Sequence, residues 1–295
     1  MTEAAQPSQA VQPRQQRQSL GLAEIMSDVL VLYLTRFPKM LLLSVPSALA
    51  MAGIFWAFFF SYDGWLPALD RQSPFFAAFV VIFGLSLTLG TGLSLAAGPM
   101  SMAFRTYRLE RRVPLQSCPA QIYRRPVQAA ICAIAVTFAT MLPLSGLAFI
   151  QGSLMALIYG LFAVGIGMYA VGRWGAAVPA VTAEGIGISA LGRANRLSQD
   201  YRWASAAAAF VLWFTAQLMG GGLAALLNAG VSAFWHLVLD RRMYSQISET
   251  LFFITFVVGI TLIANLLALG LAALRERLVQ IKDPPDVTEF LDVFD

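Results

Sequence analysis

The sequence predicts an all-α protein, a polytopic membrane helix bundle with six transmembrane helices and amphipathic interfacial helices on the cytoplasmic side. Composition is the first observation behind this prediction: 58% of the 295 residues are hydrophobic and only 12% are charged, whereas a soluble domain usually carries about 25% charged residues. The second is that five windows lack any Asp, Glu, Lys or Arg, each long enough to cross a bilayer: 40–62, 72–104, 126–172, 203–239 and 250–274.

The number of spans follows from the lengths of these windows. A transmembrane helix needs roughly 20 apolar residues, so the window 126–172 is expected to hold two, and helices are expected because lipid cannot satisfy free backbone groups. The predicted spans are about 39–61, 75–99, 127–149, 153–172, 204–227 and 250–274. They form a membrane domain over 19–277, between a disordered N-terminal tail (1–18) and a cytoplasmic C-terminal tail (278–295).

Prolines and small residues predict how the spans begin and pack. Pro38, Pro74 and Pro126 precede the first three spans, and proline suits the first turn of a helix. The run Gly220–Gly222 in span 5 is expected either to break that helix, as in transporter sites, or to form a close-packed bend. Small residues spaced four apart predict close contacts within the bundle, with homo-oligomerisation as the alternative use: Ala163 and Gly167; Ala216 and Gly220; Ala264, Ala268 and Ala272.

The placement of basic residues predicts the orientation. Of the 20 Lys and Arg residues, all but Arg71, Arg241 and Arg242 fall on one side of the predicted spans, and cytoplasmic loops retain positive charge. We therefore expect a multi-pass protein of the bacterial inner membrane with both termini cytoplasmic. Anionic membrane lipids are possible partners of the same arginines, whereas nucleic acid is not expected because the charges lack a set of stacking aromatic residues.

Three segments on the predicted cytoplasmic side share one pattern. Residues 20–37, 117–125 and 186–202 each precede a span and combine apolar with polar positions at helical spacing. Each is predicted to be an interfacial helix that leads into a transmembrane hairpin, so the chain would consist of three such units. The alternative is that any loop helix beside a membrane must be amphipathic, which would make the likeness accidental.

The residues that catalysis would need are scarce, and we expect no enzyme, no metal and no cofactor. The single histidine, His236, has no second His or Cys near it in the sequence to complete a metal site, and no phosphate-binding loop is present. The predicted spans contain no ionisable Asp, Glu, Lys or Arg of the kind that ion-coupled transporters use. Gln217 and Asn265 remain candidates for a polar pathway, with interhelical hydrogen bonding as the simpler alternative.

The segment after span 4 carries a recurrent motif, in which Pro179 and Glu184 are followed by Ala190, Leu191, Arg193 and Leu197, and then by Trp203. This segment resembles the membrane domain found ahead of some glycerophosphodiester phosphodiesterases, and related stand-alone six-span bacterial membrane proteins. Ala194 stands where that family usually has Ser. The resemblance implies the six-span fold but not the phosphodiesterase activity, which belongs to a separate metal-binding barrel.

The resemblance directs attention to Glu184 and Arg193. The carboxylate of Glu184 is expected to accept hydrogen bonds from an arginine such as Arg173 or Arg193, with Arg196 as a further structural or regulatory candidate. A structural clamp and a ligand site are both open. The function expected from the sequence is a non-enzymatic membrane protein that organises or regulates lipids or a protein partner on its cytoplasmic face; the alternative is a transporter or channel for an apolar or amphipathic solute.

Overall fold

The computed structural model describes residues 20–60, 74–113, 115, 125–143, 153–238 and 241–283, and within these ranges every regular element is a helix. The predicted N-terminal tail, residues 284–295 of the predicted C-terminal tail, and residues 117–124 of the second predicted interfacial segment lie outside the described residues. Residues 278–282, predicted as the start of the C-terminal tail, are instead part of the last helix. The elements are α1 (Leu22–Thr35), α2 (Phe37–Phe55), η1 (Trp56–Phe60), α4 (Pro74–Glu110), α5 (Pro126–Met141), α6 (Ser153–Trp174), α7 (Ala177–Glu184), η4 (Gly187–Ser189), α8 (Ala190–Leu197), α9 (Arg202–Ala216), η5 (Gln217–Gly221), α10 (Gly222–Val238) and α11 (Arg241–Lys282).

Five helical segments are long and apolar enough to cross a membrane, as a multi-pass membrane protein requires. They are Phe37–Phe58, Phe76–Glu110, Leu154–Glu184, Arg202–Phe234 and Thr250–Lys282. The helix at the third predicted span, α5, is also apolar but has 16 residues, and the rest of that span, 144–149, lies outside the described residues. Six spans therefore stay a prediction, while five helices of spanning length are shown.

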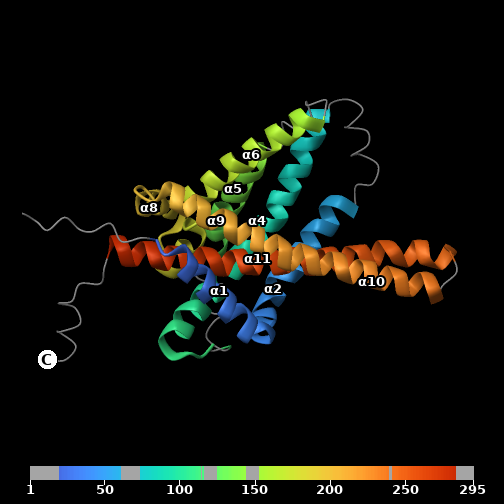
Figure 1. Cartoon of the computed structure of the whole chain (residues 1–295), viewed down its shortest axis with the longest axis horizontal. Coiled ribbons are helices and arrows are strands. Elements are labelled where there is room, and N and C mark those ends of the chain that lie inside the picture. The colour runs from blue at the N-terminus through green and yellow to red at the C-terminus, as the bar shows by residue number, and fades with distance from the viewer. Residues whose placement is uncertain are drawn as a thin grey trace, which may run out of the picture.

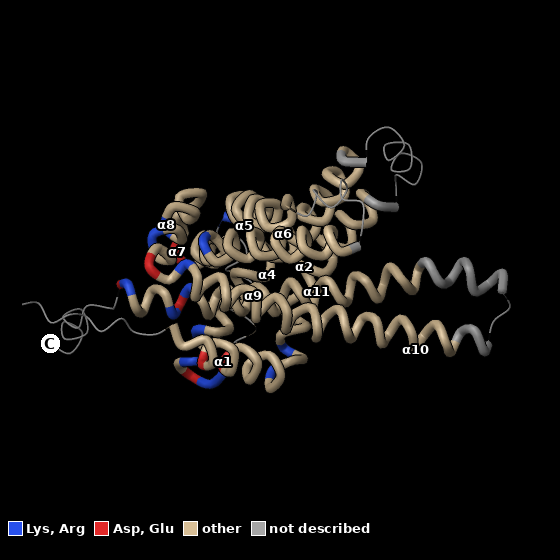
Figure 2. Tube along the Cα trace, turned by 45° about the horizontal axis from the view of Figure 1, so that its top comes forward, with Lys and Arg blue, Asp and Glu red and all other residues tan. Residues whose placement is uncertain are grey.

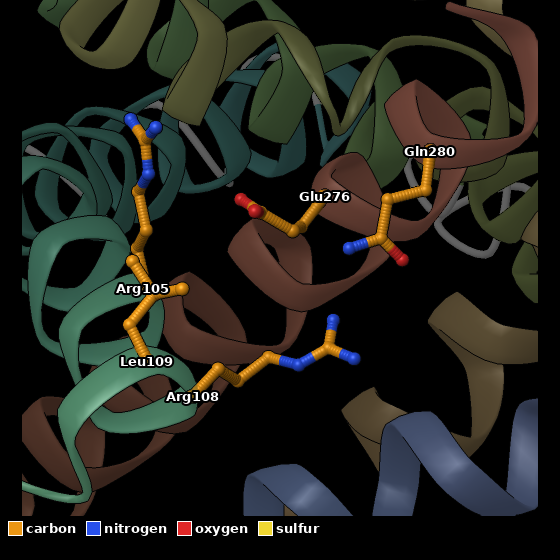
Figure 3. Close-up of a pocket in the computed structure, with 5 residues that line it drawn as sticks. All are labelled: Arg105, Arg108, Leu109, Glu276 and Gln280. Atoms are coloured by element: carbon orange, nitrogen blue, oxygen red, sulfur yellow. The ribbon is translucent and has the colours of Figure 1, made fainter. Parts of the chain in front are cut away.

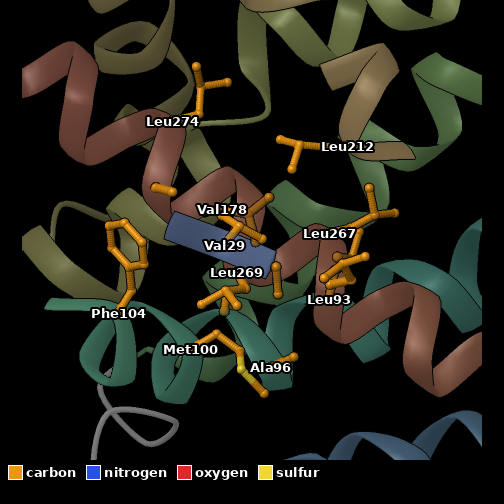
Figure 4. Packing of buried hydrophobic residues seen from close by; sticks show 14 of the residues in the cluster. Val29, Leu93, Ala96, Met100, Phe104, Val178, Leu212, Leu267, Leu269 and Leu274 are labelled. Atoms are coloured by element: carbon orange, nitrogen blue, oxygen red, sulfur yellow. The ribbon is translucent and has the colours of Figure 1, made fainter. Parts of the chain in front are cut away.

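The long helix α11 organises the bundle. Figure 1 shows α11 along the long axis of the molecule, with α10 beside its N-terminal half and α1 near its C-terminal half, while α4, α5 and α6 leave at an angle. Helix α11 contacts α1, α2, α4, α7, α8, α9 and α10. The main apolar core forms where several of these helices meet (Figure 4).

The core combines large side chains from four helices. Leu269 and Leu274 of α11 pack in one cluster with Val29 of α1, Met100 of α4 and Leu212 of α9, each at most 1% exposed. Helix α1 is therefore part of the packed body, as well as an amphipathic segment ahead of a span. Inside a lipid bilayer such side chains stabilise the bundle by close packing between helices rather than by removal from water.

Most of the described charges gather at one end of the bundle. In Figure 2 the coloured Lys, Arg, Asp and Glu residues lie on α1, on α7 and α8, and on the helix ends near them. We call this part of the molecule the charged end. The other charged residues of the described helices are Arg241, Arg242 and Glu249, at the N-terminal end of α11. Burial also raises the pKa of Tyr33, which lies in α1, to about 12.

Two helices extend past the spans predicted from the uncharged windows. Helix α4 continues to Glu110 and α11 to Lys282, so Arg105 and Arg108, assigned from the sequence to a loop, lie on a helix. The ends of the uncharged windows mark the first charged residues, but a helix can continue past a charged residue that lies beyond the bilayer. Hydropathy alone therefore underestimates the length of both helices.

The glycine run in span 5 does not break its helix. Gln217–Gly221 forms a π-helical turn and α10 continues to Val238. A Cβ added at Gly220 would lie 2.8 Å from the carbonyl oxygen of Gly259 in α11, so the second sequence-based alternative, a close-packed bend, describes this site. Packing by small residues is confirmed in α11 as well, where Ala264, Ala268 and Ala272 are all buried.

A second close approach joins α6 to α9 and gives a test of this packing. A Cβ at Gly172 would lie 2.5 Å from the backbone nitrogen of Ala206, whereas a Cβ at Gly165, in the same helix, would meet nothing within 4 Å. We expect Gly172→Ala to destabilise the protein by about 1–3 kcal/mol through overpacking. Thermal unfolding in detergent measures this, with Gly165→Ala as the control that keeps the wild-type melting temperature. Equal melting temperatures for the two variants would contradict the packing.

Candidate functional site

The candidate site begins with a short buried helix that carries Glu184 at its end. In α7, residues 177–182 are all buried, and the helix contacts α4, α5, α8 and α11. Pro179 is tolerated because it lies in the first turn. Gly185 ends the helix with a φ of 67°, a left-handed conformation that glycine adopts without steric cost. Glu184 is therefore the last residue of a helix whose first six residues anchor it in the core.

The carboxylate of Glu184 joins α7 to α8 and α11. Arg275 donates to its Oε1 through Nη2 at 2.7 Å and Nε at 3.2 Å, and Nε of Arg193 lies 3.4 Å from its Oε2. The side chains of Arg275, Glu184 and Arg193 are 13%, 21% and 29% exposed. Partial burial strengthens charge-assisted hydrogen bonds relative to fully exposed pairs, so this group can hold three helices in a fixed arrangement.

Further ion pairs extend from α11. Arg193 also pairs with Asp283, and Lys282 pairs with Asp200. Arg277 lies 3.1 Å from a carboxylate oxygen of Glu24 in α1. We call these contacts, together with the Glu184 group, the ion-pair cluster; its members are Glu24, Glu184, Arg193, Asp200, Arg275, Arg277, Lys282 and Asp283. The cluster ties α1, α7, α8 and the following turn to the C-terminal end of α11.

The other sequence-based candidates near Glu184 have different roles. Arg173 does not pair with Glu184; its Nε donates to Oδ1 of Asn195 at 2.7 Å, and its guanidinium lies 5.0 Å from the ring centroid of Trp174. Arg196 is exposed, and its side chain has no ion-pair partner within the ranges that the structure describes. Of the arginines named from the sequence, only Arg193 reaches the Glu184 carboxylate.

Sequence reasoning missed Arg275, which makes the closest contact with Glu184. The two residues are 91 positions apart, so no local spacing connects them. One signal was available: Arg275 is the first charged residue after window 250–274, just as Arg173 is the first after window 126–172. Both were thus expected at the same membrane interface, but the sequence could not choose between them.

The two candidates for a polar pathway are not brought together. Gln217 lines a cavity of about 330 Å³ between α4, α5, η5, α10 and α11, and Asn265 does not line it. Asn265 is fully buried, and neither its amide nitrogen nor its oxygen has a hydrogen-bond partner among the described residues. The interhelical hydrogen bond considered for Asn265 is therefore not seen in this part of the chain.

The described residues contain no group of three or more His, Cys, Asp or Glu side chains that could hold a metal ion. The side chain of His236 lies outside the described part of the chain. Within the ion-pair cluster every carboxylate has a basic partner, and these ion pairs hold neighbouring helices together. Comparison with protein-family models, curated proteins and solved structures finds no match to this chain.

The role of Glu184 as a clamp gives a direct prediction. Glu184→Gln keeps the shape of the side chain but removes its charge, so Arg193 and Arg275 lose their shared partner. We expect a loss of about 1–3 kcal/mol in the free energy of unfolding, measured by thermal unfolding in detergent.

The control is Glu110→Gln, because Glu110 is exposed and makes no ion pair with another described residue. A double-mutant cycle with Arg275→Gln should show coupling above 0.5 kcal/mol, as expected for residues in contact. Additive losses in that cycle would contradict the clamp.

Asn265 is a sequence-based candidate for a polar pathway, and its buried amide has no hydrogen-bond partner among the described residues. Because its buried amide lacks hydrogen bonds, Asn265→Leu should raise the free energy of unfolding by about 1 kcal/mol. The matched control is Thr261→Val, since the Thr261 hydroxyl already donates to the carbonyl of Val257 at 2.6 Å and gains nothing from substitution. If Asn265→Leu instead lowers the melting temperature, Asn265 has a partner that its surroundings here do not include.

Proposed function

We propose that this chain is a non-enzymatic, six-span protein of a bacterial inner membrane, with both termini cytoplasmic, that organises or regulates membrane lipids or a membrane protein partner. One observation carries the proposal: most of the described charged residues lie together at one end of the bundle, and the described helices have only Arg241, Arg242 and Glu249 elsewhere. The charged end would face the cytoplasm, because basic residues are retained on that side. The resemblance to the membrane domain of glycerophosphodiester phosphodiesterases supports the same topology.

The chemistry of the charged end supports binding rather than catalysis. Its arginines outnumber its acids, so basic residues with no ion-pair partner among the described residues, such as Arg111, Arg112 and Arg196, are available to anionic surfaces. Juxtamembrane arginines contribute about 1 kcal/mol each to the attraction of anionic headgroups. The ion-pair cluster holds α1, α7 and α8 in place as a platform on which a lipid or a protein can dock.

Purification of the full chain in mild detergent tests this function. We expect co-purified lipid whose headgroup composition differs from that of the source membrane, or a stoichiometric protein partner, as measured by lipid mass spectrometry and light scattering. Neutralising Arg111, Arg112 and Arg196 together with Gln should reduce the retained anionic lipid several-fold, because each headgroup contact is electrostatic. A lipid-free, partner-free monomer would overturn the proposal.

A specific observation keeps the transporter alternative in view. The cavity of about 330 Å³ is lined by nine apolar or small residues and one polar one, Gln217: Leu85, Leu89, Met141, Gln217, Gly221, Ala224, Phe256, Gly259, Ile260 and Ile263. Such a lining suits an apolar or amphipathic solute, and the adjoining π-helical turn belongs to a class often found at functional sites. Uptake of a fluorescent amphiphile into proteoliposomes, reduced by Gln217→Leu, would favour this alternative.

A further inference from the structure

A separate cavity at the charged end lies between α4 and α11. It has a volume of about 340 Å³ and is lined by Arg105, Arg108 and Leu109 of α4 and by Glu276 and Gln280 of α11. Figure 3 shows the two arginines extending from one side of the space and the Glu276 and Gln280 side chains from the other. Sites for small molecules have volumes of about 300–1,000 Å³, so this cavity can hold a compact polar group.

The depth of the cavity follows from the two helices that form it. On α4, Arg105 comes directly after the uncharged window that ends at Phe104, and on α11, Glu276 lies two residues after the window that ends at Leu274. Both walls therefore leave the apolar part of the bundle at the same level. In a membrane-spanning bundle this is the level of the lipid headgroups, because the hydrocarbon core covers the uncharged stretch.

The charges that face this cavity are largely unused by the fold. Arg105 and Glu276 make neither an ion pair nor a side-chain hydrogen bond with any other described residue, although both line the cavity. Arg108 has one ion pair, 3.9 Å from Asp28, and both side chains are more than a third exposed. A weak surface contact of this kind contributes little, so Arg108 remains available to a ligand.

A second cavity, which shares two residues with the first, lies next to α7. Arg105 and Glu276 also line this smaller cavity of about 150 Å³, together with Gly98, Thr182 and Arg275. Arg275 is already bound to Glu184, so Arg105 and Glu276 are the charged side chains that both cavities share and that have no other partner among the described residues. A ligand in the larger cavity would therefore meet positive and negative charge at once.

This mixture of charges selects the ligand. Guanidinium groups bind phosphate oxygens through paired N–H donors, whereas the Glu276 carboxylate and the Gln280 amide oxygen accept hydrogen bonds from an ammonium group. A purely anionic headgroup would meet the charge of Glu276, and a purely cationic group would meet the two arginines. We propose that the cavity binds a zwitterionic group with a phosphate and a primary ammonium, the phosphoethanolamine headgroup of a membrane lipid.

The proposal rests on the function proposed above and names the lipid class for one site. A lipid is favoured over free phosphoethanolamine because the cavity lies at headgroup depth, where the uncharged stretches of α4 and α11 end. The phosphate would then lie on Arg105 and Arg108 and the ammonium on Glu276.

Native mass spectrometry of the full chain in detergent tests the assignment. Three lipids with identical acyl chains are titrated: phosphatidylethanolamine, phosphatidylcholine and phosphatidylglycerol. We expect phosphatidylethanolamine to bind most tightly, because the methylated ammonium of phosphatidylcholine cannot donate hydrogen bonds and phosphatidylglycerol has no ammonium. Arg105→Gln and Glu276→Gln should each weaken phosphatidylethanolamine binding about tenfold, and Glu276→Gln should leave phosphatidylglycerol binding unchanged or stronger.

The control variants are Arg112→Gln and Glu110→Gln, which remove an exposed charge of each sign outside the cavity lining and should bind phosphatidylethanolamine like the wild type. Thermal unfolding of every variant identifies those that are misfolded. A competition arm with soluble phosphoethanolamine distinguishes the source: weak competition supports a lipid, and complete competition at similar concentration supports the same site chemistry with a soluble ligand.

Two results would overturn the site. One is equal binding of phosphatidylethanolamine to the wild type and to the well-folded Arg105→Gln and Glu276→Gln variants; the other is tighter binding of phosphatidylglycerol than of phosphatidylethanolamine. Failure of the site is distinguishable from failure of the proposed function, because a wild-type chain that still retains other lipids or a protein partner keeps that function without this cavity.

Discussion

The packing of α11 against seven other helices is the interaction on which the rest of the structure depends. Its C-terminal half is buried almost without interruption, and Leu266, Leu269, Leu274 and Leu278 are each at most 1% exposed. Lipid tails are as apolar as these leucines, so hydrophobicity gives no preference for a neighbouring helix over lipid. Close contact must supply the attraction instead, and the row of alanines at 264, 268 and 272 allows neighbouring helices to approach.

The ion-pair cluster adds specificity that apolar packing lacks. A charge at the centre of a bilayer is costly, and the ion pairs among the described residues all lie at the charged end, where partial exposure lowers the cost of burying them. There Glu184 fixes α7, which has only eight residues and could not remain folded alone. The short helices at the charged end are thus held by buried apolar faces on one side and by arginines of α8 and α11 on the other.

Much of the bundle was predictable from the sequence. Charged residues are costly in lipid, so the spans appear in the sequence as uncharged windows. The helix of span 4 was expected at 153–172 and is found at Ser153–Trp174. The extensions of α4 and α11 were not predictable, since a helix beyond the bilayer is stabilised by contacts with neighbours that hydropathy does not register. The approach of Arg193 to Glu184 followed from a local motif, whereas Arg275 reaches the same carboxylate through tertiary packing, which no sequence spacing records.

The cluster and the cavity between α4 and α11 are connected through the helical repeat of α11. Successive residues on an α-helix point about 100° apart, so Arg275, Glu276 and Arg277 face three different directions: towards Glu184, towards the cavity and towards Glu24. Gln280, four residues after Glu276, returns to the cavity side. The ion pairs of Arg275 and Arg277 therefore set the rotation of α11 about its axis, and this rotation decides whether Glu276 faces the arginines of α4. The cavity shares no residue with the ion-pair cluster, yet the cluster in this way positions the α11 side of the cavity.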